Sequence, residues 1–104
     1  MFNINGIDWE VKFASPNHPK LRRNTSNSFA LGSCDDLTKT IYISEKVPMN
    51  MLRKVLCHEV THAAMFSYHV NLELSQEELI ADLIATYGSE IISVTNRIFS
   101  HLTK

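Results

Sequence analysis

The sequence predicts a small α+β protein, and three features carry that prediction. The first 44 residues contain short runs in which apolar and polar side chains alternate, the pattern of half-buried β-strands. Two later segments, 49–67 and 75–102, have apolar residues at helical spacing. A chain of 104 residues can bury one hydrophobic core but not two, so we expect a single domain over residues 1–104.

Charge and composition narrow the class of protein. The formal net charge is −1, so nothing in the overall balance indicates binding to nucleic acid or to a membrane surface. No apolar run approaches the roughly 20 residues of a membrane span, and residues 1–6 do not resemble a signal peptide. We therefore expect a cytoplasmic protein with no nucleic-acid or membrane partner, in which Cys34 and Cys57 are free thiols.

Residues 2–4 and 7–13 are predicted to form a β-hairpin. The Asn5-Gly6 pair between them is the strongest short signal for a two-residue turn. In the second segment four apolar residues alternate with charged ones, and these are Ile7, Trp9, Val11 and Phe13. These four side chains should share one buried face of the sheet.

The next part of the chain is predicted to be irregular and then to return to strands. Residues 15–27 are rich in polar and basic side chains, which favours a loop or poorly formed helix with a solvated surface. Alternating and β-branched residues then predict an antiparallel hairpin of strands 28–33 and 40–44 joined by 34–39. The resulting sheet should be small and mostly antiparallel.

The first predicted helix, which begins at residue 49 or 50 and ends at 67, contains the most specific motif of the chain. His58, Glu59 and His62 form a His-Glu-x-x-His arrangement. Residues four apart stack on one face of an α-helix, so His58 and His62 can bind one metal ion from successive turns. Glu59 would lie beside the ion and within reach of water that it could deprotonate.

The alternative for this motif is an amphipathic helix whose histidines are solvated or satisfied by hydrogen bonds in the core. Apolar side chains surround the motif on nearly every side of the helix and predict that it is buried: Met51, Leu52, Val55, Leu56, Val60, Ala63, Ala64 and Phe66. Two histidines and a glutamate are costly to bury without a partner, and a metal ion supplies one. The context therefore favours a metal site.

A catalytic zinc usually has three protein ligands, so the two histidines need a third. Acidic residues and histidines downstream supply the candidates Glu73, Glu77, Glu78, Asp82, His69, Glu90 and His101. Of these, Glu78 and Asp82 lie four residues apart on the second predicted helix and hence on one face. A carboxylate at Glu78 can complete the site, while Asp82 accepts a hydrogen bond from a ligating histidine.

Both acidic residues have another interpretation. Ser75-x-x-Glu78 also matches a capping box, in which Glu78 would accept a hydrogen bond from a backbone N–H at the start of the helix. One carboxylate cannot fill both roles, and capping gives no reason for Asp82 to stand among apolar neighbours. The ligand role is therefore favoured for Glu78, and the alternative for Asp82 is a charge that faces solvent.

The motif, followed later by Glu78-Leu79-Ile80-Ala81-Asp82, resembles the gluzincin metallopeptidases. The small size and the strands that lead into the motif helix are most similar to the minimal gluzincins related to the ImmA/IrrE-like group, which are often found in phages and mobile elements. The resemblance covers about residues 28–87. It implies a zincin-like fold in which a small sheet packs on the motif helix and a second long helix supplies the third ligand.

Carried over by position, the resemblance implies that His58, His62 and Glu78 bind Zn²⁺. It also implies that Glu59 is the general base and that Asp82 orients His58. The strand near Ser28 to Gly32 would be the sheet edge along which an extended peptide lies. No residue clearly matches the histidine or tyrosine that stabilises the transition state in this family, for which the candidates are Tyr68, His69 and Tyr87.

The sequence thus predicts a zinc-dependent metallopeptidase that acts on a protein or peptide substrate, for example a regulatory protein. One alternative is a catalytically inactive, zincin-like protein-binding module with a structural zinc. Another is a metal-free phage structural or regulatory protein that carries the motif by accident. Metal content separates the first two from the third, and hydrolysis separates the first from the second.

Overall fold

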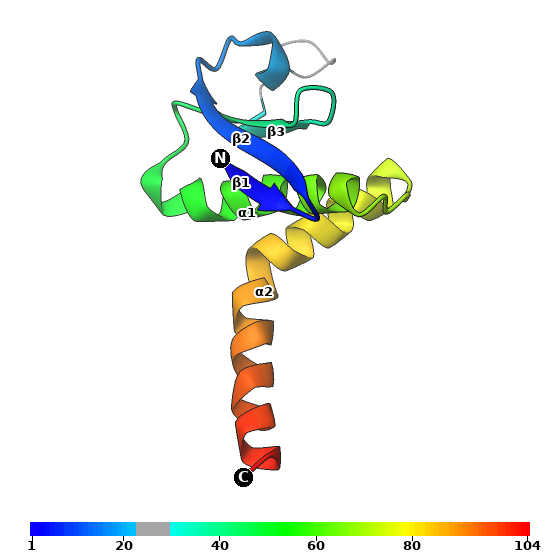
Figure 1. The fold of residues 1–104 in the computed structure, drawn as a ribbon. Coiled ribbons are helices and arrows are strands. Elements are labelled where there is room, and N and C mark those ends of the chain that lie inside the picture. Colours follow the sequence, from blue (N-terminus) through cyan, green and yellow to red (C-terminus); the bar gives the residue numbers. More distant parts are fainter. Residues whose placement is uncertain (23–29) are drawn as a thin grey trace.

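The computed structural model describes residues 1–22 and 30–104 of the chain. Within these residues the elements are β1 (Phe2–Ile4), β2 (Ile7–Ala14), the 3-10 turn η1 (Pro19–Leu21), β3 (Gly32–Asp35), β4 (Thr40–Ser44), α1 (Met49–Ser67) and α2 (Leu74–Leu102). The expected α+β class is confirmed, with a small sheet on one side of α1 (Figure 1).

The sheet has four strands in the order β1-β2-β4-β3. Both predicted hairpins are present, because β1 pairs antiparallel with β2 and β3 pairs antiparallel with β4. The pairing between the hairpins is parallel, with Val11 opposite Ile41 and Phe13 opposite Ile43. The sheet is therefore mixed, and its central parallel pair was not part of the sequence prediction.

The first hairpin turns where the Asn-Gly signal places it. Asn5 has φ 51° and Gly6 has φ 80°, so both residues adopt the left-handed conformation that a two-residue turn between twisted strands requires. The backbone N–H of Gly6 donates a hydrogen bond of 3.0 Å to Oδ1 of Asn3. The turn residues therefore account for the register of β1 on β2.

Within the described residues, the third strand begins and ends later than predicted. The prediction was 28–33, but β3 runs from Gly32 to Asp35. Residues 28 and 29 of the predicted strand lie outside the described residues, and so do residues 23–27 of the predicted loop. Asp35 explains the shift, because its carboxylate accepts hydrogen bonds from the N–H of Leu37 and the hydroxyl of Thr38. These bonds begin the turn after Asp35 and leave Cys34 in the strand.

The core lies between the sheet and α1. Trp9, Ile41, Ile43 and Ala63 are each fully buried and form one cluster. Trp9 also donates a hydrogen bond of 2.8 Å from Nε1 to the hydroxyl of Ser67, at the end of α1. Burial of one such indole removes on the order of 200 Å² from water, which stabilises the fold by about 5 kcal/mol.

Two expectations about burial were only partly correct. On β2, Trp9 is buried but Phe13 is 60% exposed, because the strand rises away from α1 towards its end (Figure 1). On α1, the residues from Glu59 to Ser67 are mostly buried, whereas Met49 and Met51 are exposed. Val11 is also exposed, so alternation correctly predicted the burial of Trp9 but not that of the later residues of β2. The extent of cover depends on how the elements cross.

The second helix lies against α1 at its start and then leaves the body of the molecule (Figure 1). It stays helical through Gly88, although Figure 1 shows that its two halves run in different directions. The radius of gyration is 15.5 Å, compared with about 13 Å for a compact chain of this length. No helix among the described residues is long and apolar enough to cross a bilayer.

Candidate metal centre

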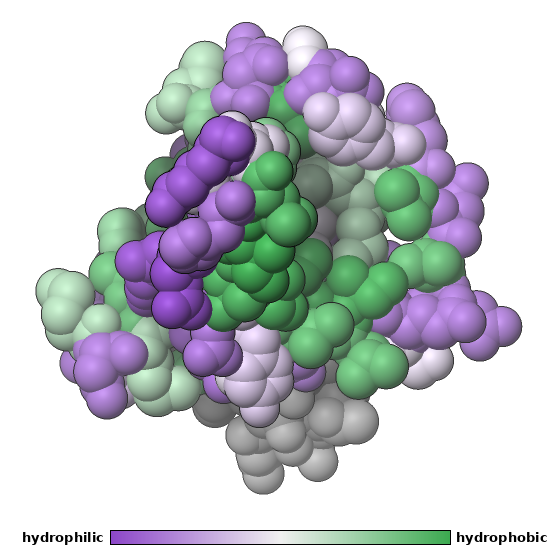
Figure 2. All heavy atoms as spheres, turned by 90° about the horizontal axis from the view of Figure 1, so that it is seen from below, coloured by the Kyte–Doolittle hydropathy of each residue, from purple (hydrophilic) through white to green (hydrophobic). Residues whose placement is uncertain are grey.

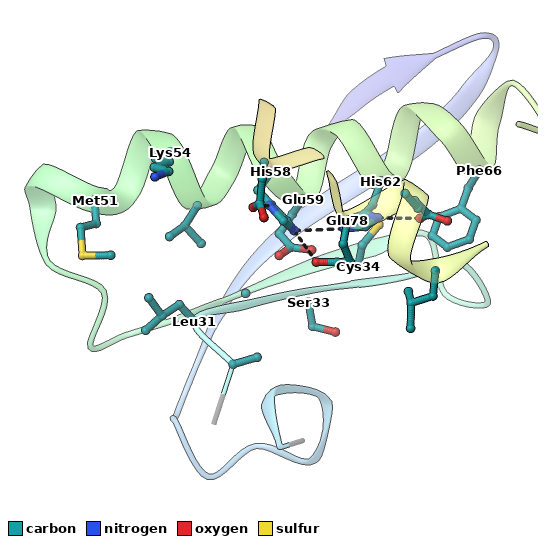
Figure 3. A pocket seen from close by; sticks show the side chains of 16 residues that line it. Leu31, Ser33, Cys34, Met51, Lys54, His58, Glu59, His62, Phe66 and Glu78 are labelled. Atoms are coloured by element: carbon teal, nitrogen blue, oxygen red, sulfur yellow. Dashed lines mark hydrogen bonds and ion pairs between the residues drawn. The ribbon is translucent and has the colours of Figure 1, made fainter. Parts of the chain in front are cut away.

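The two helices bring together side chains that are far apart in the sequence. His58 and His62 project from successive turns of α1 towards Glu78 of α2 (Figure 3). The first turns of α2 bring three acidic residues to these two histidines. Those acidic residues are Glu77, Glu78 and Asp82. The predicted set of His58, His62 and Glu78 therefore meets at one point.

The donor atoms at this point have the spacing of a metal site. The Nε2 atoms of His58 and His62 are 3.1 Å apart. The Glu78 carboxylate lies 3.2 Å from Nε2 of His58 and 2.8 Å from Nε2 of His62. Adjacent ligands of a tetrahedral zinc are about 3.3 Å apart when each bond is 2.0–2.1 Å, so these three side chains fit one ion.

Each imidazole is also held on its other nitrogen by a carboxylate. Nδ1 of His58 is 2.9 Å from Asp82, as the resemblance implied, and Nδ1 of His62 is 2.6 Å from Glu77. A carboxylate at this position favours the tautomer with the proton on Nδ1, which leaves the lone pair of Nε2 free for a metal. Both histidines are therefore oriented towards the same point.

The role of Glu77 was missed by the sequence analysis, which considered it only as a candidate third ligand. A weak signal was present, because a ligating histidine needs a partner for its second nitrogen and Glu77 adjoins Glu78. Local spacing does not show how α2 is rotated against α1. Only that rotation distinguishes an acidic residue that reaches His62 from one that faces solvent.

The start of α2 is capped by residues other than Ser75 and Glu78. Glu73 is the N-cap residue, and its side chain accepts from the backbone of Gln76, whose own side chain accepts from the backbone N–H of Glu73 at 3.2 Å. This reciprocal pair is a capping box two residues earlier than the sequence match. Glu78 is consequently free to point at the histidines.

Glu59 is a buried carboxylate beside these residues, with 7% of its surface exposed. Burial raises its pKa and the nearby Glu78 raises it further, while His58 and His62 act in the opposite direction. A raised pKa makes a carboxylate a better proton acceptor near neutral pH. The position and environment of Glu59 therefore suit a general base.

Glycine 32 allows the sheet edge to pass close to Glu59. A Cβ at this position would lie 2.9 Å from Cγ of Glu59, closer than real Cβ atoms approach, and 3.0 Å from Cγ1 of Val55. The strand that contains Gly32 is an edge strand of the sheet, as the resemblance implied, but with the later bounds 32–35. Its backbone forms one wall of the site.

The site opens into a pocket of about 590 Å³ between β3, α1 and α2 (Figure 3). Its lining residues are Ala30, Leu31, Gly32, Ser33, Cys34, Met51, Lys54, Val55, His58, Glu59, His62, Phe66, Leu74, Glu77, Glu78 and Asp82. Tyr68, His69 and Tyr87, the three candidates for a transition-state stabiliser, are absent from this lining among the described residues. Tyr68 and Tyr87 are more than half exposed.

The two cysteines are free, as expected. Cys34 had no role assigned from the sequence, but its side chain lines the pocket. Burial is the largest cause that raises the pKa of this thiol, and the nearby carboxylates of Glu59, Asp36, Asp35 and Glu77 raise it further. The thiol form is therefore strongly favoured, which disfavours Cys34 as a nucleophile.

No protein-family model, curated protein or solved structure matches this chain. The kind of site is therefore inferred from the arrangement of its own side chains. Two histidines and a glutamate form a group that can hold a metal ion.

Proposed function

We propose that this protein is a zinc-dependent metallopeptidase with a zincin-like fold, related to the minimal gluzincins. One observation carries the proposal. The Nε2 atoms of His58 and His62 and the carboxylate of Glu78 converge within 4.8 Å beside the buried Glu59. Each histidine is also held in place by a second carboxylate, from Asp82 or Glu77.

The donor set fits zinc better than the hard cations. Imidazole nitrogen with a single carboxylate is a common zinc set, whereas magnesium and calcium favour oxygen ligands. A zinc ion bound there supplies a Lewis acid that polarises a carbonyl group and promotes ionisation of water. Three protein donors are typical of catalytic sites, because they leave a position for water or substrate.

The remaining chemistry belongs to the protein side chains. Glu59 takes a proton from the attacking water and then transfers it to the leaving amine. Asp82 and Glu77 hold the two imidazoles through Nδ1, at 2.9 and 2.6 Å. An extended peptide from a protein substrate, for example a regulatory protein, would pair with the edge strand that contains Gly32 and present its backbone to Glu59.

The proposal is tested by separating metal binding from hydrolysis. We expect Glu59→Gln to retain about one zinc per chain and to lose cleavage of an unfolded protein by at least about 100-fold. His62→Ala should lose both properties. His69→Asn is the control, because His69 lies outside the pocket lining and asparagine tolerates its φ of 55°. Unchanged cleavage by the glutamine variant would contradict the mechanism.

The pocket lining also favours a second candidate, an inactive zincin-like module that binds a protein through a structural zinc. The supporting observation is that Tyr68, His69 and Tyr87 do not line the described pocket. This candidate predicts that the wild-type chain binds zinc without cleaving any unfolded protein. Replacement of Glu59 by glutamine would then change neither property.

A further inference from the structure

The second half of α2 exposes a large apolar surface. Every residue from Ser89 to Leu102 is exposed, and the exposed fraction is 65% for Phe99 and 78% for Leu102. Other large apolar side chains on this half are also exposed, namely Leu83, Ile84, Tyr87, Ile91, Ile92, Val94, Ile98 and Leu102. Contiguous apolar surfaces of this kind usually mark an interaction site.

The composition of this segment indicates that it does not depend on helix propensity for its stability. Isoleucine, valine and threonine are frequent from residue 84 onward, and Gly88 lies within it. These residue types form helices less readily than alanine or leucine, and most of the stability of a helix in a protein comes from packing of its apolar face. Burial of the apolar face against a partner would supply the missing stability.

The apolar residues follow the repeat of a coiled coil. Ile84, Ile91 and Ile98 are seven residues apart, and Tyr87 and Val94 lie between them at the alternating spacing of three and four. We call these five residues the α2 seam. Such a seam packs against another seam of the same kind. Figure 2, viewed from below, shows hydrophobic side chains gathered on one side of the projecting helix.

Two charged residues flank the α2 seam on one side. Glu90 and Arg97 each directly precede an isoleucine of the seam and are seven residues apart. Neither takes part in an ion pair within the part of the chain that the structure describes. When two copies pair antiparallel, Glu90 of each copy lies beside Arg97 of the other. A parallel pair would place these charges beside Thr95 and Leu102 instead.

The area of the surface is sufficient for a pair. At about 200 Å² for a large side chain, the exposed fractions of the α2 seam and Leu102 amount to on the order of 600 Å². Contact between two such surfaces would bury on the order of 1,200 Å², the lower limit for a stable interface. Ile92 and Phe99 are also exposed, but they lie about 100° around the helix from Ile91 and Ile98 and are not counted in this area.

We propose that the α2 seam is a self-association surface and that a second copy of this chain binds it in the antiparallel orientation. The heptad repeat, the reciprocal Glu90 and Arg97 pairs and the area support this occupant. The proposal does not depend on metal binding or on hydrolysis.

The experiment measures the mass of the full chain by sedimentation equilibrium at micromolar concentration. We expect twice the chain mass. Ile91→Glu with Ile98→Glu should give the monomer, whereas Ser93→Glu with Asn96→Glu adds the same charge on the polar face and should leave the assembly intact. A wild-type monomer would overturn the proposal. This holds also if that monomer binds anionic vesicles or another protein through the same surface.

Charge reversal tests the orientation. Glu90→Arg places like charges at both reciprocal contacts and should weaken association about tenfold. The double variant Glu90→Arg with Arg97→Glu should restore the wild-type affinity, because the pairs form again with exchanged signs. Equal affinity in the wild type, single and double variants would overturn the antiparallel arrangement.

Discussion

At the residue scale, the candidate centre is defined by contacts on both nitrogens of each imidazole. Glu78 approaches the two Nε2 atoms, while Asp82 and Glu77 occupy the two Nδ1 positions. Four interactions therefore limit the rotation of two side chains. Such limits lower the entropy that is lost when a metal binds.

We expect Glu77→Gln and Asp82→Asn each to weaken zinc binding by about 10 to 100-fold, because each removes a carboxylate from an imidazole Nδ1. Competition with a chelating indicator measures the affinity. Glu10→Gln, an exposed substitution on β2, is the matched control and should bind zinc as the wild type does. Wild-type affinity in the Glu77 variant would show that its 2.6 Å contact does not orient His62.

A second prediction at this scale concerns acid stability. Nζ of Lys20 lies 2.9 Å from Asp35 and connects η1 to β3. The hydrogen bond from Lys20 is the largest cause that lowers the pKa of Asp35 below its ordinary 3.8. The contribution of this carboxylate to the free energy of unfolding is therefore fully present above pH 3.8, the ordinary pKa. It is lost as the pH falls through the lower pKa of the folded protein.

Lys20→Met removes the cation and should reduce this dependence on pH. Between about pH 7 and about pH 3, we expect the thermal midpoint of the wild type to fall more than that of the variant. The difference between the two proteins should be small, because the ion pair is near the surface. Parallel curves for the two proteins would contradict the assignment.

At the element scale, the start of α2 determines where the acidic residues lie. The cap formed by Glu73 and Gln76 fixes the first turn. We expect Gln76→Ala to lower the free energy of unfolding by about 1 kcal/mol and to weaken zinc binding, since the next two residues are Glu77 and Glu78. Ser75→Ala is the matched control, and a larger loss in that variant would contradict the observed cap.

The approach of β3 to α1 gives another prediction. Gly32→Ala introduces a Cβ within 3.1 Å of Oε2 of Glu59 and should displace that carboxylate. Zinc content should be unchanged, while cleavage should fall by about tenfold or more, because misplacement of a catalytic group reduces the rate steeply. Ser33→Ala on the same strand is the control. Equal loss in both variants would show that the effect is not specific to this contact.

The sequence predicted those features of the fold that depend on residues close together in the chain. Asn5-Gly6 identified the first hairpin, and the bounds of α1 at Met49 and Ser67 were confirmed. The parallel pairing of β2 with β4 was not predicted, because it joins residues 30 positions apart in the chain. The contact of Glu77 with His62 was missed for the same reason, since it depends on the crossing of two helices.

At the scale of the whole molecule, the sheet, α1 and the start of α2 form a packed body that carries the site, and the rest of α2 projects from it (Figure 1). The apolar spacing of residues 79–102 predicted this helix but not its exposure. Helical periodicity identifies a face that needs burial, but it does not say which surface covers that face. Among the described residues nothing buries this face, because every residue from Ser89 to Leu102 is exposed.

The central claim is that His58, His62 and Glu78 bind one zinc ion. The most direct measurement is the zinc content per chain of untagged protein, purified without chelator and washed free of loose metal, in the wild type and in Glu78→Ala. We predict about one equivalent in the wild type and a large loss in the variant. No zinc in the wild type, even after zinc is offered to the folded protein, would contradict both the site and the peptidase proposal.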